Sequence, residues 1–181
     1  VGSSGAMVAA LYARYARKPM PLDQANVPEK LQAMKAEMAQ MEGFFHGRSS
    51  GMDPTICYLQ LPLLLRSAQD IGTVSMPDLP LNGRGGVFLL NSGGPGETQP
   101  MVQIFMDKLK EEGFRRLMTE QFKCYNDACV AAFLEGKTDV LLRELKKLSG
   151  LVLANFGPMI PSDYHNLWQK GIDTNAYYLK L

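Results

Sequence analysis

The sequence lacks the features that mark several large classes of protein. Its 19 basic and 18 acidic residues leave a net charge of +1, and no basic stripe is interleaved with aromatic residues, so the electrostatic signature of a nucleic-acid-binding protein is missing. The longest apolar runs, at residues 61–65 and 87–90, are far too short to span a bilayer. No arrangement typical of a signal peptide is found. We therefore expect neither a nucleic-acid nor a membrane partner.

Cysteine and histidine are also scarce. The three cysteines, Cys57, Cys124 and Cys129, are an odd number in unrelated contexts, which is typical of reduced thiols in a cytoplasmic protein. The two histidines, His46 and His165, have no cysteine or carboxylate at metal-ligand spacing, which argues against a zinc site.

Hydrophobic residues, by contrast, make up 46% of the 181 residues, which is enough to bury a core in one domain or in two small lobes. Helical periodicity and Pro, Gly or Asn boundaries predict helices that begin after Gly5 and at Pro28, the second ending near Met41 before a loop at residues 44–51. The second of these carries a stripe of Leu31, Met34, Met38 and Met41, typical of core filling. Further helices are expected at residues 101–113, 114–134, 138–154 and 162–170, the last one stopping at Gly171.

Strands are expected at residues 61–66, 72–76, 86–90 and 176–181. Helices, a few strands, a run of helices and one strand in that order favour an α+β fold over alternating α/β units. Dense Pro and Gly place a boundary between two lobes near residues 77–86, and we assign them as 1–80 and 81–181.

A small-residue segment, Gly2-Ser3-Ser4-Gly5, stands at the head of the first predicted helix. Backbone N–H groups there, together with the positive end of the helix dipole, would form a phosphate cradle. A serine hydroxyl could also reach a Mg²⁺ ion. The alternative is an expression-tag linker.

Two carboxylates follow. Asp53 comes after a Ser-Gly turn in the segment His46-Gly-Arg-Ser-Ser-Gly-Met-Asp53 and could accept or orient the proton of a hydroxyl group. Alternatively, Asp53 before Pro54 is a helix cap. Glu42 lies 53 − 42 = 11 residues upstream, and a lone glutamate at a helix end is normally a solvated surface charge.

These segments resemble a known family. VGSSGAMVAALYARY is similar to the second motif of the kinases named for galactokinase, homoserine kinase, mevalonate kinase and phosphomevalonate kinase, usually Pro-x-x-x-Gly-Leu-Gly-Ser-Ser-Ala. Val1 stands at the Leu position, and Gly5 where alanine is usual. HGRSSGMD resembles the mevalonate kinase segment His-Gly-x-Pro-Ser-Gly-x-Asp, with Ser49 in place of proline, and Glu42 has the spacing of a magnesium-binding glutamate in that enzyme.

Two later segments extend the resemblance over the whole chain. FLLNSGGPGETQPMV resembles the family's strand and loop Leu-Leu-Thr-Asn-Thr-x-Val-Pro-x-x-Thr, with Gly94 before Pro95 in place of valine. The final YLKL resembles the strand that leads into a third, glycine-rich motif. The resemblance implies a two-lobed small-molecule kinase fold with an incomplete N-terminal lobe, and a C-terminal lobe in which helices pack on an antiparallel sheet.

Residue by residue, the resemblance implies ATP and Mg²⁺ as cofactors and a set of roles. Asp53 would activate the acceptor hydroxyl, Ser4 and Glu42 would bind Mg²⁺, and the phosphates would lie on Gly2, Ser3, Ser4 and Gly5. The acceptor pocket would be shaped by His46, Ser50, Gly51 and Ser92.

The favoured reaction is the ATP-dependent phosphorylation of mevalonate to 5-phosphomevalonate, a step of isoprenoid biosynthesis. A sugar kinase of the same superfamily, acting on galactose or a heptose phosphate, is the nearest alternative, and a non-catalytic helical interaction module is another. A homodimer is an open alternative for the assembly. Because the first and third motifs are missing, we expect the polypeptide of residues 1–181 to show little or no kinase activity.

Overall fold

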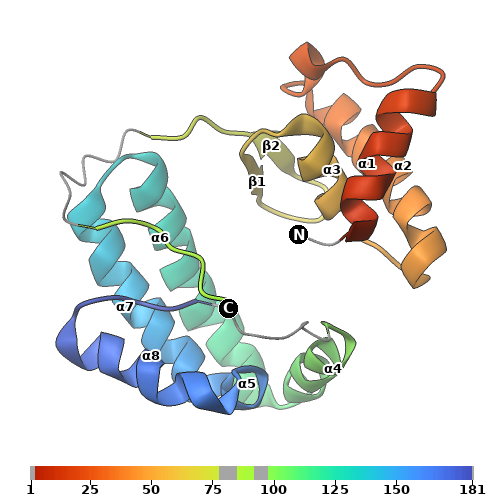
Figure 1. The fold of residues 1–181 in the computed structure, drawn as a ribbon. Helices are drawn as coiled ribbons and strands as arrows, with labels where there is room; N and C mark the ends of the chain where they lie inside the picture. The colour runs from red at the N-terminus through yellow and green to blue at the C-terminus, as the bar shows by residue number, and fades with distance from the viewer. Residues whose placement is uncertain (1–2, 78–84, 92–97, 181) are drawn as a thin grey trace. The chain divides into compact units, whose positions relative to one another are not determined.

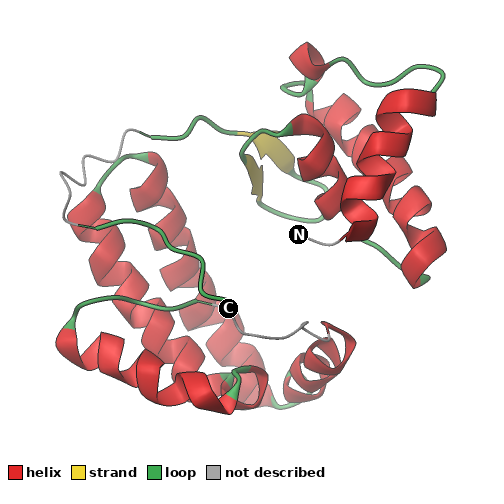
Figure 2. Cartoon of the chain, in the orientation of Figure 1, coloured by secondary structure: helices red, strands yellow, loops and turns green. Residues whose placement is uncertain are grey.

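The computed structural model describes residues 3–77, 85–91 and 98–180. It divides into two compact units, Val1–Met76 and Pro77–Leu181 (Figure 1). The expected boundary between residues 80 and 81 lies just after this division, in a segment outside the described residues. Figure 2 shows that helices dominate and that the strands form one small sheet, an α+β composition in the broad sense.

The first unit consists of three helices, a short 3₁₀ turn and a hairpin. In chain order these are α1 (Ser3–Tyr15), η1 (Leu22–Gln24), α2 (Pro28–His46), α3 (Met52–Leu59), β1 (Leu63–Leu65) and β2 (Ile71–Thr73). Each helix packs on the other two, and β2 packs on α2. As predicted, a helix begins at Pro28, which is a favoured first helical residue because it lacks an N–H group.

The core of the first unit lies along the predicted stripe of α2. Leu31, Met34 and Met38 are buried, and Val8 of α1 and Leu59 of α3 pack into the same cluster. The methionines are therefore core residues, as the spacing predicted.

Two tyrosines secure the chain where it leaves α1. The backbone N–H of Met20 donates to the Tyr12 hydroxyl at 3.0 Å, and the Tyr58 hydroxyl donates to the Met20 carbonyl at 2.8 Å. The two rings meet edge to face, with centroids 5.1 Å apart. This contact joins the end of α1 to α3.

The antiparallel hairpin of β1 and β2 pairs Leu63 with Thr73 and Leu65 with Ile71. In its turn the Ser67 hydroxyl accepts hydrogen bonds from two backbone N–H groups, at 3.2 and 3.0 Å. Both strands fall within or next to the segments predicted as strands.

The second unit is helical over its described residues. Its elements are α4 (Thr98–Lys108), α5 (Glu112–Arg116), the π-helical segment η2 (Leu117–Phe122), α6 (Lys123–Leu134), α7 (Thr138–Asn155), the 3₁₀ turn η3 (Gly157–Met159) and α8 (Ser162–Thr174). The predicted helix at residues 114–134 corresponds to the continuous run of α5, η2 and α6. In this unit α7 packs against both α6 and α8.

Aromatic side chains form the core of the second unit. Phe105, Phe114 and Phe122 surround Phe156, with ring centroids 5.6 to 6.1 Å from its own. The buried Trp168 of α8 donates its indole N–H to the hydroxyl of buried Ser149 of α7, at 2.7 Å. This bond satisfies both polar groups inside an apolar core.

Two predicted strands in the second unit are wrong over their described residues. Residues 85–91 and 176–180 have no regular secondary structure, and the side chain of Phe88 is 85% exposed. A strand requires a hydrogen-bonding neighbour, and none is found among residues 85–91 and 98–180. The expected sheet beneath the C-terminal helices is therefore absent from this part of the chain, and the only described sheet lies in the first unit.

Several helix ends also differ from the predictions. The first helix begins at Ser3 and not after Gly5, and the helix predicted at residues 101–113 is α4, which ends at Lys108. The second helix continues beyond residue 41 to His46, so that residues 44–46, expected as a loop, are helical. Gly171 does not end α8, which runs to Thr174. A Cβ at Gly171 would lie 2.4 Å from the ring of Tyr177, so glycine is needed here because the following chain folds back over the helix.

In the described part of the chain, no helix combines the length and the apolar character needed to cross a membrane. The three cysteines, Cys57, Cys124 and Cys129, are free thiols in the structure.

Replacing Thr55 by valine is expected to stabilise the first unit. Thr55 of α3 is fully buried, and its hydroxyl has no hydrogen-bond partner among the residues that the structure describes. Because a buried unsatisfied hydroxyl costs about 1 to 3 kcal/mol, Thr55→Val should raise the free energy of unfolding by about 1 kcal/mol in chemical denaturation. Thr55→Ser, which keeps the hydroxyl and loses the methyl group, should lower it. A valine variant less stable than the wild type would contradict this account.

Candidate functional site

Three helices bring the predicted phosphate-loop serine and the two predicted carboxylates together. Ser4 lies in the first turn of α1, Glu42 in the last turn of α2, and Asp53 in the first turn of α3. The Ser4 hydroxyl donates a hydrogen bond to Glu42 Oε1 at 3.0 Å, across 38 residues of sequence. Glu42 is thus part of a tertiary contact and not a solvated helix end.

Glu42 is only 5% exposed. It lies four residues after Met38 and so continues the buried stripe of α2 by one turn. Within the described residues, no lysine or arginine is within ion-pair distance of this carboxylate. Burying a carboxylate without a countercharge is unfavourable, which makes this position suited to a bound cation.

A second hydroxyl, that of Ser49, reaches the same carboxylate. Ser49 donates a hydrogen bond to Glu42 Oε2 and accepts one from the backbone N–H of Gly51 at 2.9 Å. Both oxygens of Glu42 are therefore hydrogen-bonded, one from α1 and one from the loop between α2 and α3. In the sequence, Ser49 stands out only as a departure from the proline of the kinase motif, and no local pattern predicts its contact with Glu42.

Asp53 lies against the first turn of α1. A Cβ added to Gly5 would be 2.9 Å from Asp53 Cβ and 3.2 Å from the Asp53 carbonyl carbon, so the two backbones approach each other closely at this point. Gly5, the residue after Ser4, stands where the kinase motif usually has alanine. The absence of a side chain at Gly5 allows Asp53 to lie next to the serine turn.

Asp53 is not the N-cap of α3. Gly51 holds the N-cap position, with φ +72° in the left-handed region, and as a glycine it makes no side-chain cap hydrogen bond. The Asp53 side chain is exposed in the first turn, where its negative charge interacts favourably with the helix dipole. The interpretation of Asp53 as a helix cap is therefore wrong.

The loop at residues 47–51 depends on its two glycines. Gly47, with φ +75°, ends α2, and Gly51 begins α3. A Cβ at Gly51 would lie 2.2 Å from the Lys35 carbonyl oxygen and 2.8 Å from the Ala39 backbone nitrogen. Gly51 thus packs directly against the backbone of α2. This contact holds the start of α3, which carries Asp53, close to α2, which carries Glu42.

The other predicted site residues are distributed as follows. Ser3 is the exposed first residue of α1, and the exposed Ser50 accepts a hydrogen bond from the backbone N–H of Met52 at 3.3 Å. His46 is the last residue of α2, and its side chain lies outside the described part of the structure. Gly2 and Ser92 also lie outside the described residues. Their predicted roles in phosphate and acceptor binding stay predictions.

The Ser4–Glu42 hydrogen bond has an ordinary length, which is also compatible with two neighbouring ligands of a magnesium ion. Neighbouring ligands of an octahedral Mg²⁺ ion, bound at about 2.0 to 2.1 Å, are about 2.9 Å apart. The 3.0 Å between Ser4 Oγ and Glu42 Oε1 fits this spacing. The described residues hold no group of three or more His, Cys, Asp or Glu side chains that could bind a metal by themselves, so this pair would need further ligands from phosphates or water.

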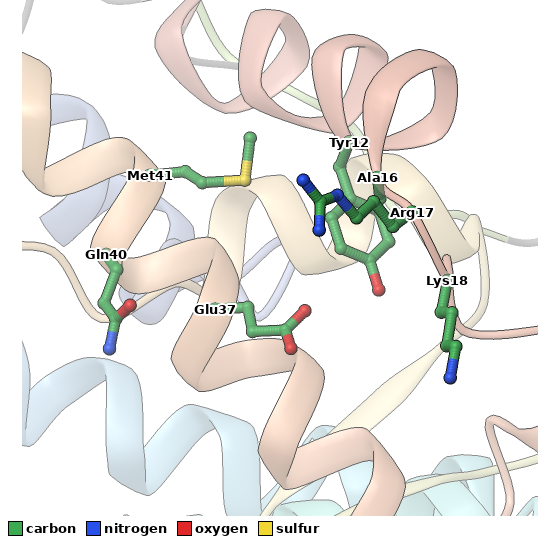
Figure 3. Close-up of a pocket in the computed structure, with 7 residues that line it drawn as sticks. All are labelled: Tyr12, Ala16, Arg17, Lys18, Glu37, Gln40 and Met41. Atoms are coloured by element: carbon green, nitrogen blue, oxygen red, sulfur yellow. The ribbon is translucent and has the colours of Figure 1, made fainter.

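A separate hollow lies at the other end of α1 (Figure 3). It has a volume of about 520 Å³ and is lined by Tyr12, Ala16, Arg17, Lys18, Glu37, Gln40 and Met41. In Figure 3 the Glu37 carboxylate and the Tyr12 hydroxyl point toward each other across it. Burial raises the pKa of the Tyr12 phenol, and the negative charge of Glu37 raises it further. None of the residues in the Ser4–Glu42 cluster lines this hollow.

Substituting the two loop glycines should show how strongly the site depends on close packing. Gly47 has open space around its Cβ position, so Gly47→Ala should cost only the backbone strain, about 1 to 2 kcal/mol. Gly51→Ala adds a collision with α2 and should cost about 3 kcal/mol or more of unfolding free energy. Urea denaturation would measure both variants, and equal losses would contradict the role assigned to the α2 contact.

Tyr12 should make the stability of the first unit pH-dependent in the alkaline range. Because the folded state raises the pKa of Tyr12, its contribution is fully present below the ordinary tyrosine pKa of about 10 and is lost as pH rises through the raised value. Tyr12→Phe should lose less stability between pH 9 and about 12 than the wild type, as measured by urea denaturation. Tyr15→Phe, at an exposed position of the same helix, is the control and should follow the wild-type curve.

Comparisons with protein-family models, with curated proteins and with solved structures found no match for this chain. The resemblance to the kinase motifs therefore stays a prediction. A function for the site has to be inferred from its own residues and from their geometry.

Proposed function

We propose that this chain carries the metal-binding and acceptor-activating groups of an ATP-dependent small-molecule kinase. The observation that supports this most directly is the contact of Ser4 with Glu42, together with the position of Asp53 against Gly5. These residues come from three separate motif-like segments, and they meet at the N-terminal turns of α1 and α3. A coincidental resemblance would give no reason for them to meet.

The proposed cofactors are ATP and Mg²⁺. Ser4 and Glu42 would hold the ion, because the 3.0 Å between their oxygens is compatible with two neighbouring ligands and because no lysine or arginine of the described residues pairs with the buried Glu42. The bound ion would neutralise charge on the phosphates during transfer. The N-terminal turn of α1, with the backbone N–H groups of Ser3, Ser4 and Gly5, would bind phosphate oxygens. Gly2 would complete this loop.

Asp53 would orient the acceptor hydroxyl or accept its proton. Its side chain is exposed, and its Cβ lies beside Gly5, the residue after Ser4. An acceptor alcohol could therefore contact the carboxylate while the phosphates lie on the first turn of α1. Phosphoryl transfer depends mainly on positioning and on charge neutralisation, and such a small set of groups suits it. Ser50 and Gly51 would border the acceptor, with His46 and Ser92 completing the pocket.

Mevalonate is the proposed acceptor because the segment that contains Asp53 resembles mevalonate kinase more closely than the other kinases of the family. A panel of mevalonate, phosphomevalonate, galactose, homoserine and a heptose phosphate, assayed for ADP release by the full-length protein, would test this. Release with galactose or the heptose phosphate alone would favour a sugar kinase. No release and no nucleotide binding would favour a non-catalytic interaction module.

Asp53→Asn should separate catalysis from nucleotide binding. The amide keeps the size of the side chain but cannot accept the proton, so turnover should fall by about a hundredfold or more. ATP affinity, measured by isothermal titration calorimetry with Mg²⁺ present, should change little. Asp70→Asn removes an exposed carboxylate that forms an ion pair with Arg66, and it should leave turnover unchanged. Full turnover in the Asp53 variant would show that this carboxylate does not act on the acceptor.

A further inference from the structure

We propose that Ser49 is a positioning residue that holds the Glu42 carboxylate in its metal-binding orientation. This inference rests on the proposed function, since it assigns a role in the same site. It concerns the residue at which the chain departs from the proline of the kinase motif. A proline there could make neither of the hydrogen bonds that Ser49 makes through its side chain.

The hydrogen bonds of Ser49 define the direction of its hydroxyl. The oxygen accepts the Gly51 backbone N–H at 2.9 Å, and the proton is donated to Glu42 Oε2. With one lone pair and the proton both engaged, the hydroxyl connects the start of α3 to the end of α2. Hydrogen bonds to a carboxylate are stronger than those between neutral groups, so the bond to Glu42 stabilises the loop more than the hydrogen bond within the turn does.

Glu42 needs such a partner because its side chain has several rotatable bonds. Ser4 holds Oε1 and Ser49 holds Oε2, so the plane of the carboxylate is fixed from two sides. Of these two donors, Ser4 belongs to the proposed phosphate loop and Ser49 belongs to the loop between α2 and α3. If Ser4 turned its hydroxyl toward another ligand, Ser49 would be the remaining hydroxyl that keeps Glu42 in place.

A purely local role for Ser49 is the competing explanation. A serine whose hydroxyl accepts a backbone N–H two residues later forms a common turn, which needs only the acceptor lone pair. Donation to Glu42, seven residues earlier in the chain and on another element, goes beyond that turn. The two explanations differ in what they predict for metal affinity.

The test uses Mn²⁺ as the probe ion in the full-length protein, with ATP present, and follows binding by electron paramagnetic resonance. Ser49→Ala removes the hydroxyl, and Ser49→Cys keeps the volume but replaces it with a weak donor. Both should weaken Mn²⁺ binding by about tenfold or more, the usual effect of removing a partner of a metal ligand. Ser49→Thr keeps the hydroxyl and should stay within about twofold of the wild type.

ATP binding in the presence of EDTA should be the same in all variants, since the Ser49 hydroxyl bonds to Glu42 and Gly51 and not to the described residues of the phosphate loop. Ser67→Ala is the matched control, because the Ser67 hydroxyl also accepts backbone N–H groups in a turn of the first unit but does not contact Glu42. It should leave Mn²⁺ affinity unchanged. Thermal melts would show whether each variant is folded. If Ser49→Ala does not fold, Ser49→Cys still tests the loss of the hydroxyl.

Two outcomes would overturn the inference, and they are distinguishable. If the wild type binds Mn²⁺ with ATP and the alanine and cysteine variants bind it equally well, Ser49 does not position Glu42, while the proposed function stands. If the wild type binds no Mn²⁺ with ATP, the proposed function fails and the role of Ser49 fails with it.

Discussion

A buried carboxylate must be satisfied by hydrogen-bond donors or by a cation, and in the first unit this requirement falls on Glu42, with which no lysine or arginine of the described residues pairs. Its two oxygens are reached by Ser4 and Ser49, which lie on either side of it in the sequence. Each donor therefore ties a separate segment to the end of α2. Hydrogen bonds to Glu42 thus fix the start of α1 and the loop before α3. The apolar stripe of α2 forms the core on which the same helices pack.

Close backbone approach is the second constraint on the same region. Gly51 presses against α2, and Gly5 presses against Asp53, so that neither position has room for a side chain. Glycine weakens a helix end by its conformational entropy, and the close packing it permits offsets this. The result is that a serine, a buried glutamate and an exposed aspartate lie at adjoining helix ends, an arrangement suited to binding phosphate and a divalent cation.

The second unit has a different organisation. Its core is a cluster of phenylalanines around Phe156, fixed on one side by the Trp168–Ser149 hydrogen bond. The described residues of this unit show no comparable cluster of buried acidic and hydroxyl groups. The β-propensity of its residues 86–90 suggested a strand, but no described neighbour pairs with them and their apolar side chains are exposed.

The sequence by itself determined the local elements: the helix that begins at Pro28, the buried methionine stripe and the helices of the second unit. Helical hydrogen bonds join residues four apart, so periodicity and helix-start signals suffice to predict them. Tertiary structure alone decided the rest. Residues 86–90 needed a partner strand, and the burial of Glu42 needed a donor from α1, 38 residues away. Ser49 reaches Glu42 because the chain turns at Gly47. Pairing of a strand or a contact with α1 joins residues far apart in the sequence, and no local pattern encodes it.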